Sequence, residues 1–143
     1  MAPLYLLDAN VLSEPTKLRS NSLVLEAIAK NHQAIATASV VYHELMFGWL
    51  AMSESRRKSE VGYYIRNSVE KILFMFSYCE TSASWHARER VRVRKVGRTP
   101  PFQDGQIAAI ASINNLTLVT RNVKDFKNFQ DLSVENWFEP STD

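Results

Sequence analysis

Short apolar runs alternate with longer segments of helical periodicity along the chain, and this pattern predicts an α/β fold. Each apolar run ends in polar residues, as buried parallel strands do. We expect strands at 3–8, 33–37, 74–78, 116–120 and 132–137. Strands separated by helical segments favour a three-layer α/β/α sandwich with a mainly parallel central sheet.

Apolar side chains recur at three- and four-residue steps between these runs, which predicts amphipathic helices. We expect helices at 23–30, 39–52, 54–74 and 102–112. Ser39 is a candidate N-cap, and Val69, Ile72 and Leu73 should turn inward. Segment 82–97 is ambiguous, because its RVRVR stretch alternates like an edge strand while the residues before it continue without Gly or Pro. We favour a helix there and leave the strand open.

Two carboxylates interrupt the apolar faces of the predicted helices. Asp104 lies one turn before Ile107 and Ala108, so the helical period carries it toward the core. Glu44 lies three residues after Val41 on an inward stripe. An ionised carboxylate in such a setting costs several kcal/mol unless it is paired or binds a metal. Plainer explanations stay open: the helix dipole could favour Asp104, and an arginine could meet Glu44.

Further polar groups stand where predicted strands end. Asp8 ends the first predicted strand, although it could simply cap the turn that follows. Asn122 and Asp125 come after the predicted strand 116–120. The loops that bind ligands converge at this edge of a parallel sheet. If these acids meet Glu44 and Asp104, a hard divalent cation would relieve their repulsion. Because His and Cys ligands are missing from these motifs, Mg²⁺ or Mn²⁺ is the expected ion.

The sequence resembles a PIN-domain nuclease of the VapC toxin type along its whole length. Four motifs carry the resemblance, in order: LLDANVLSE, VVYHELMFG, PPFQDGQIAAIA, and LTLVTRNVKDF followed by VENW. The first supplies an Asp with an Asn two residues on, and the second supplies a helical Glu. Each motif alone is weak, whereas four in order at these spacings are specific.

The resemblance implies a single nuclease domain over 1–143 that hydrolyses RNA phosphodiester bonds with a metal-activated water. By position, Asp8, Glu44 and Asp104 match the three carboxylates that hold Mg²⁺ or Mn²⁺ in the family. Asn10 and Thr120 match polar residues that usually support this site in the family. Many relatives carry a fourth acid where this chain has Asn122; the charged alternative is Asp125, which we include among the catalytic residues.

The resemblance also implies partners. Relatives commonly form homodimers and are inhibited by a VapB antitoxin, so we expect a homodimer and a VapB-like antitoxin. Transfer RNA and a ribosomal RNA loop are both compatible substrates. An alternative is a non-catalytic RNA-binding or regulatory module. Asn122 suggests it, because this neutral residue replaces an acid that many relatives carry.

Charge and special residues add detail. Setting aside the four candidate acids leaves 17 basic side chains against 11 acidic ones, so the remaining surface can contact phosphates. The expected RNA-binding residues are Arg88, Arg92, Arg94, Lys95, Arg98 and Arg121. His32 and His86 should be surface residues, and the single cysteine, Cys79, a small buried side chain in a reducing cytoplasm. No apolar run is long enough to predict a membrane span.

Overall fold

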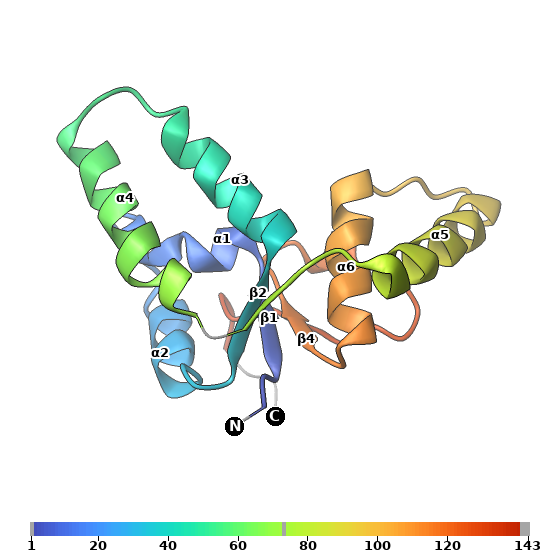
Figure 1. Ribbon diagram of the computed structural model, residues 1–143. Helices are drawn as coiled ribbons and strands as arrows, with labels where there is room; N and C mark the ends of the chain where they lie inside the picture. Colours follow the sequence, from blue (N-terminus) through green and yellow to red (C-terminus); the bar gives the residue numbers. More distant parts are fainter. Residues whose placement is uncertain (1, 73, 141–143) are drawn as a thin grey trace.

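A parallel five-stranded sheet forms the centre of the computed structural model, which describes residues 2–72 and 74–140 (Figure 1). The strands are β1 (Tyr5–Leu7), β2 (Ile35–Ala38), β3 (Phe74–Phe76), β4 (Thr117–Val119) and β5 (Val134–Glu135). They lie in the order β3-β2-β1-β4-β5, and each neighbouring pair is parallel. Helices flank this sheet, and the predicted fold class is confirmed.

In residues 2–72 and 74–140, nine helical segments connect the strands. The α-helices are α1 (Ala9–Leu12), α2 (Ser22–Lys30), α3 (Ser39–Leu50), α4 (Arg56–Asn67), α5 (Glu80–Lys95) and α6 (Phe102–Ile113) in the described part of the chain, with 3₁₀ turns η1 (Glu14–Thr16), η2 (Val69–Lys71) and η3 (Val123–Asp125). The ambiguous segment 82–97 is helical in α5, because a helix buries Ser82, Glu89 and Val93 on one stripe.

The helix boundaries next to β2 and β3 differ from the prediction. The expected helix 54–74 ends at Asn67, and the chain then turns through η2 into β3. Val69 is buried as expected and Ile72 is partly buried, whereas Leu73 lies outside the described residues. Ser39 is the first residue of α3 and not its cap, since the N-cap position falls on Ala38 at the end of β2.

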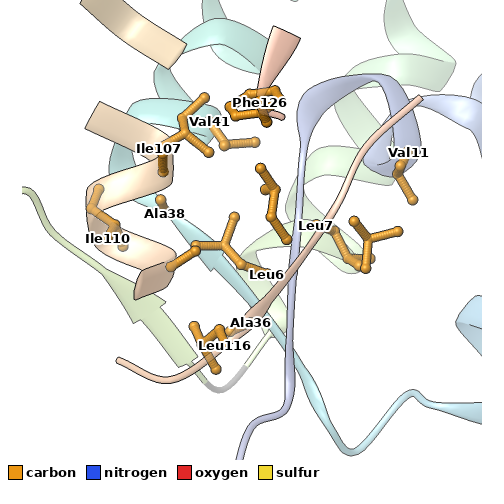
Figure 2. Close-up of a cluster of buried hydrophobic side chains, with 14 of the residues drawn as sticks. Leu6, Leu7, Val11, Ala36, Ala38, Val41, Ile107, Ile110, Leu116 and Phe126 are labelled. Atoms are coloured by element: carbon orange, nitrogen blue, oxygen red, sulfur yellow. The ribbon is translucent and has the colours of Figure 1, made fainter. Parts of the chain in front are cut away.

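The core lies on both faces of the sheet. Leu6 and Leu7 alternate along β1, so Leu6 points toward Ile110 of α6 and Leu7 toward Val11 of α1 (Figure 2). All four of these side chains are fully buried, and burial of each contributes about 1.5–3 kcal/mol. This packing holds β1 at the centre of the fold and fixes where its carboxyl end emerges.

The carboxyl ends of β1 and β4 lie side by side. Leu7 pairs with Val119 in the parallel register, and Asp8 N donates a hydrogen bond of 2.9 Å to the carbonyl of Val119. The residues that follow, Asp8 and Thr120, are therefore brought together from opposite ends of the chain. Among the described residues, no helix has the length and apolarity needed to cross a membrane.

Candidate active site at the carboxyl edge of the sheet

Asp8 is the most firmly held acid of the site. It is only 7% exposed and caps α1, with Oδ1 accepting from Ala9 N at 2.8 Å. Its Oδ2 accepts from Thr120 Oγ1 at 2.8 Å. Burial raises the pKa of Asp8, the hydrogen bonds from Thr120 and Ala9 lower it, and the charge of Asp125 raises it again. The capping explanation of Asp8 is therefore correct, and it coexists with a place in the acidic site.

Thr120 connects the polar residues around Asp8. Its fully buried Oγ1 donates to Asp8 and accepts from Asn10 Nδ2 at 3.3 Å and from Asn122 N at 3.2 Å. The other end of the Asn10 amide accepts from Arg121 N at 3.1 Å. These contacts place the two predicted supporting residues, Asn10 and Thr120, beside Asp8.

Asp104 and Glu44 approach the same region from two helices. Asp104 lies half-buried in the first turn of α6, and its pKa is raised to about 6 by burial and then by the charges of Asp125, Asp8 and Glu44. Partial loss of hydration raises the pKa of Glu44, as does the charge of Asp8, while a hydrogen bond from the Gln103 side chain lowers it. We did not predict a role for Gln103 from the sequence, although it directly precedes Asp104.

Glu44 is exposed, so the prediction that it lies where solvent is scarce is wrong. The reason is the course of α3, which rises away from the sheet and forms a projecting arm with α4 (Figure 1). Val41, near the base of α3, is the residue of this helix that the core buries. Beyond Val41, little of the core lies against α3, so Glu44 is exposed there. Its charge nevertheless raises the pKa of Asp104.

The four acids form one electrostatic group, and the charge of His43, the smallest of the influences on Glu44, lowers the pKa of that residue only slightly. Asp125 raises the pKa of both Asp8 and Asp104, which links it to the site, whereas Asn122 contributes a backbone N–H to Thr120. Within residues 2–72 and 74–140, none of the four forms a salt bridge, so the suggestion that an arginine meets Glu44 is wrong. In the same part of the chain, no three His, Cys, Asp or Glu side chains are already grouped closely enough to hold a metal ion.

The donor chemistry nevertheless suits a hard cation. All four side chains offer carboxylate oxygens, the ligands that Mg²⁺ and Mn²⁺ prefer. Raised pKa values at Asp8, Glu44 and Asp104 mean that their ionised forms are destabilised in this arrangement. A divalent cation would reverse that effect, because it favours the ionised forms and competes with protons for them.

The basic residues divide into engaged and exposed ones. Arg92 forms a two-point ion pair with Glu89, at 2.8 and 2.9 Å, and also donates to the carbonyl of Asn128. Glu89 in turn accepts from Gln130 N at 2.8 Å, so Arg92 and Glu89 tie α5 to the loop before β5. The other predicted RNA-binding residues are exposed: Arg88, Arg94, Lys95, Arg98 and Arg121. Arg121 stacks on Phe138, 4.6 Å from the ring centroid.

Two predictions about special side chains are wrong in opposite senses. His86 is 2% exposed and makes a 2.8 Å contact between Nδ1 and the hydroxyl of Tyr78, whereas Cys79 is exposed. The start of α5 explains both. The helix begins immediately after Cys79, which places Ser82 and His86 four residues apart on its buried stripe. Correct placement of this helix start would have identified His86 as a buried residue.

Comparisons with known proteins place the chain among toxin-antitoxin components. No protein-family model matches it. Ribonuclease VapC2 of Rickettsia felis is 30% identical over 139 residues, which cover 94% of this chain and 98% of that protein. The structure of FitAcB from Neisseria gonorrhoeae is similar with a TM-score of 0.87 and 25% identity, over 96% of this chain and 100% of the other. VapBC2 from Rickettsia felis, bound to a DNA fragment from its promoter, gives a TM-score of 0.80 and 24% identity over 96% and 99% of the two chains.

Proposed function

Because the chain belongs to the VapC family of toxin ribonucleases, we propose that it is an endoribonuclease dependent on Mg²⁺ or Mn²⁺. One observation carries the proposal. Asp8, Glu44, Asp104 and Asp125 act on one another at the edge of the sheet, and burial and mutual repulsion raise the pKa of the first three. A site of this kind gains from a bound cation, because none of these acids forms a salt bridge within the described residues.

Each acid has a distinct part in this proposal. Asp8, Glu44 and Asp104 hold the ion, and Asp125 completes the negative site. When bound, the ion supplies Lewis acidity, which lowers the pKa of a water molecule and neutralises charge on the phosphate. Asp8 would be a well-oriented ligand, because Ala9 N and Thr120 Oγ1 already orient the two oxygens of its carboxylate. We expect cleavage to leave a 5′-phosphate and a 3′-hydroxyl.

RNA approaches this negative site along basic side chains. Arg121 follows Thr120 directly, is exposed, and is supported by the ring of Phe138. Arg88, Arg94 and Lys95 are exposed on α5, and Arg98 follows the end of this helix and is also exposed. These groups offset the repulsion between phosphates and the acids. Arg92 contributes less than its neighbours, because Glu89 and Asn128 already occupy its guanidinium.

A VapB-like antitoxin is the proposed regulatory partner, and a homodimer is the proposed assembly. The similar Rickettsia felis structure is a VapBC2 complex on DNA, which supports a paired antitoxin. On the α3–α4 arm, Phe47, Leu50 and Tyr63 are exposed, at 67%, 58% and 71%. Exposed apolar side chains on a projecting arm favour self-association. Light scattering on the purified chain, alone and with an antitoxin encoded by an adjacent gene, measures both assemblies.

Cleavage assays test the proposed function. The purified chain would be incubated with transfer RNA and ribosomal RNA fragments in Mg²⁺, in Mn²⁺ or with EDTA, and the new 5′ ends sequenced. We expect cleavage with either metal, none with EDTA, and none by Asp8→Ala or Asp104→Ala. Cleavage that persists in EDTA, or in both variants, would overturn the proposal.

A non-catalytic RNA-binding module is the second candidate. It is favoured by the neutral Asn122, and by the finding that no three potential ligands in the described ranges are already gathered around one point. Calorimetric titration separates the two functions. Tight RNA binding without Mn²⁺ binding at millimolar concentration would support the module, whereas Mn²⁺ binding that Asp8→Ala abolishes would support the nuclease.

A further inference from the structure

We propose that His86 is a positioning residue for the acidic site: its buried ring supports the first turn of α6 and so fixes the direction in which Asp104 points. This inference rests on the proposed function for its biological meaning. Its physical content is a contact between α5 and α6. That contact involves the residues on both sides of Asp104 and none of the acids themselves.

The first part of the contact is the space left by Gly105. A Cβ atom added to Gly105 would lie 2.1 Å from Nε2 and 2.6 Å from Cδ2 of His86. These distances are too short for real atoms, so the imidazole occupies the space that any other residue at 105 would need. The ring therefore lies directly against the backbone of α6, one residue beyond Asp104.

The second part holds the ring in place. His86 Nδ1 lies 2.8 Å from the Tyr78 hydroxyl, and the two rings meet edge to face with centroids 5.8 Å apart. The imidazole also packs on Phe102, the first residue of α6, with ring centroids 4.8 Å apart. Arg90 in turn lies over Phe102, 5.1 Å from its centroid. Asp104 is thus bracketed by two residues, Phe102 and Gly105, that both touch His86.

This support matters because α6 begins without a conventional cap. Pro101 occupies the N-cap position and has no side-chain acceptor for the free N–H groups of the first turn. Lateral packing by His86 limits fraying of that turn, which carries Asp104. Burial and the nearby Arg90 lower the pKa of His86, which favours the neutral ring, and a neutral ring does not oppose the positive end of the helix.

The α3–α4 arm provides a natural control. There a Cβ on Gly62 would lie 2.6 Å from Trp49 Cζ2, so Gly62 also admits an aromatic ring between two helices. Neither Trp49 nor Gly62 adjoins an acid of the site in sequence. Gly48, in α3, has open space where a Cβ would be added. Alanine substitution should therefore disturb the position of Asp104 at Gly105, only the helix packing at Gly62, and neither at Gly48.

The test compares Gly105→Ala, Gly62→Ala, Gly48→Ala and Tyr78→Phe in the full chain. Carboxyl NMR titration would follow the pKa of Asp104, thermal unfolding would follow stability, and calorimetry would follow Mn²⁺ affinity. We expect G105A and Y78F to shift the pKa of Asp104 and to weaken Mn²⁺ binding, by about 10-fold for G105A. G62A should lower thermal stability without changing either quantity, and G48A should change neither and stabilise α3 slightly.

Second-site suppression sharpens the test. His86→Ala removes the ring with which the Cβ of G105A would clash. We therefore expect the double variant G105A/H86A to resemble H86A alone, so that the effects of the two substitutions are non-additive. An Asp104 pKa unchanged in folded G105A and Y78F would overturn the inference. That NMR measurement requires neither metal nor RNA. Failure of wild-type cleavage would therefore count against the proposed function, while the titration would still decide the role of His86.

Discussion

The strand side and the helix side of the acidic site are built differently. On the strand side, Asp8 is buried, and its two oxygens accept hydrogen bonds from Ala9 N and from Thr120 Oγ1. On the helix side, Asp104 is half-buried and Glu44 is exposed, and they are carried by α6 and by the projecting α3. The sheet thus fixes one carboxylate through backbone register, whereas the positions of the others depend on helix packing.

This difference is visible in the pKa values. Hydrogen bonds from Thr120 and Ala9 oppose the rise that burial causes at Asp8. At Asp104 every identified cause acts in the same direction, since burial and three neighbouring acids all raise the pKa, to about 6. The helix side therefore carries the group whose charge is most easily lost, and which we expect to respond most strongly to a cation.

The largest expected effect comes from neutralising one acid on each side. Asp8→Asn and Asp104→Asn should each reduce RNA cleavage by at least about 1,000-fold, because both remove a proposed ligand of one cooperative site. Their effects on stability should differ. D104N removes a repelled charge and should stabilise the metal-free chain, whereas D8N breaks a satisfied network and should destabilise it. Initial rates and urea midpoints measure both effects; equal stability changes would remove the distinction between the two sides.

The next effect isolates the strand-side network. Thr120→Val keeps the shape of the side chain but leaves Asp8 Oδ2 without its donor, which should cost about 1–3 kcal/mol of unfolding free energy. It should also raise the pKa of Asp8 further, because that hydrogen bond lowers it. Thr37→Val is the matched control: it removes a buried hydroxyl that donates to the carbonyl of Leu7 at 3.3 Å. If both variants shift the pKa of Asp8 equally, the network has no special role.

A pH effect should appear on the helix side. Asp104 has an ordinary pKa of 3.8 and a folded-state pKa of about 6. Between these values the folded chain binds more protons at Asp104 than the unfolded chain, so this group should make the metal-free protein more stable as pH falls from 7 toward 4. Denaturant midpoints of the wild type minus those of D104N would measure the contribution. A difference that is flat with pH would contradict it, as would Mn²⁺ binding that is no weaker at pH 5.5 than at 7.5.

The smallest expected effect concerns the fourth acid. Asp125→Asn should lower the pKa of Asp104, since the charge of Asp125 is the largest coulombic cause of its rise. We expect cleavage to fall by only about 10-fold, because Asp125 is exposed and the other acids remain. Asn122→Asp is the complementary change and should raise the same pKa. If N122D strengthens Mn²⁺ binding while D125N leaves it unchanged, position 122 belongs to the metal site.

The sequence predicted the parts of the site that depend on local pattern. Strand ends and helical periodicity placed Asp8, Asp104 and the Thr120 turn correctly, since each follows from a buried run and its period. The exposure of Glu44 was not predictable in this way, because it depends on where α3 leaves the sheet. The burial of His86 depends on the helix start after Cys79 and on packing against a distant glycine, which no local window contains.

The pairing of β1 with β4 also has a consequence for the timing of synthesis. Asp8 and the Thr120 hydroxyl that orients it are separated by 112 residues along the chain. At roughly 5–20 residues per second, a ribosome needs on the order of ten seconds to make that interval. A nascent chain cannot complete the strand side of the site before β4 has emerged and docked beside β1. The fold thereby delays assembly of its acidic centre until most of the protein has left the ribosome.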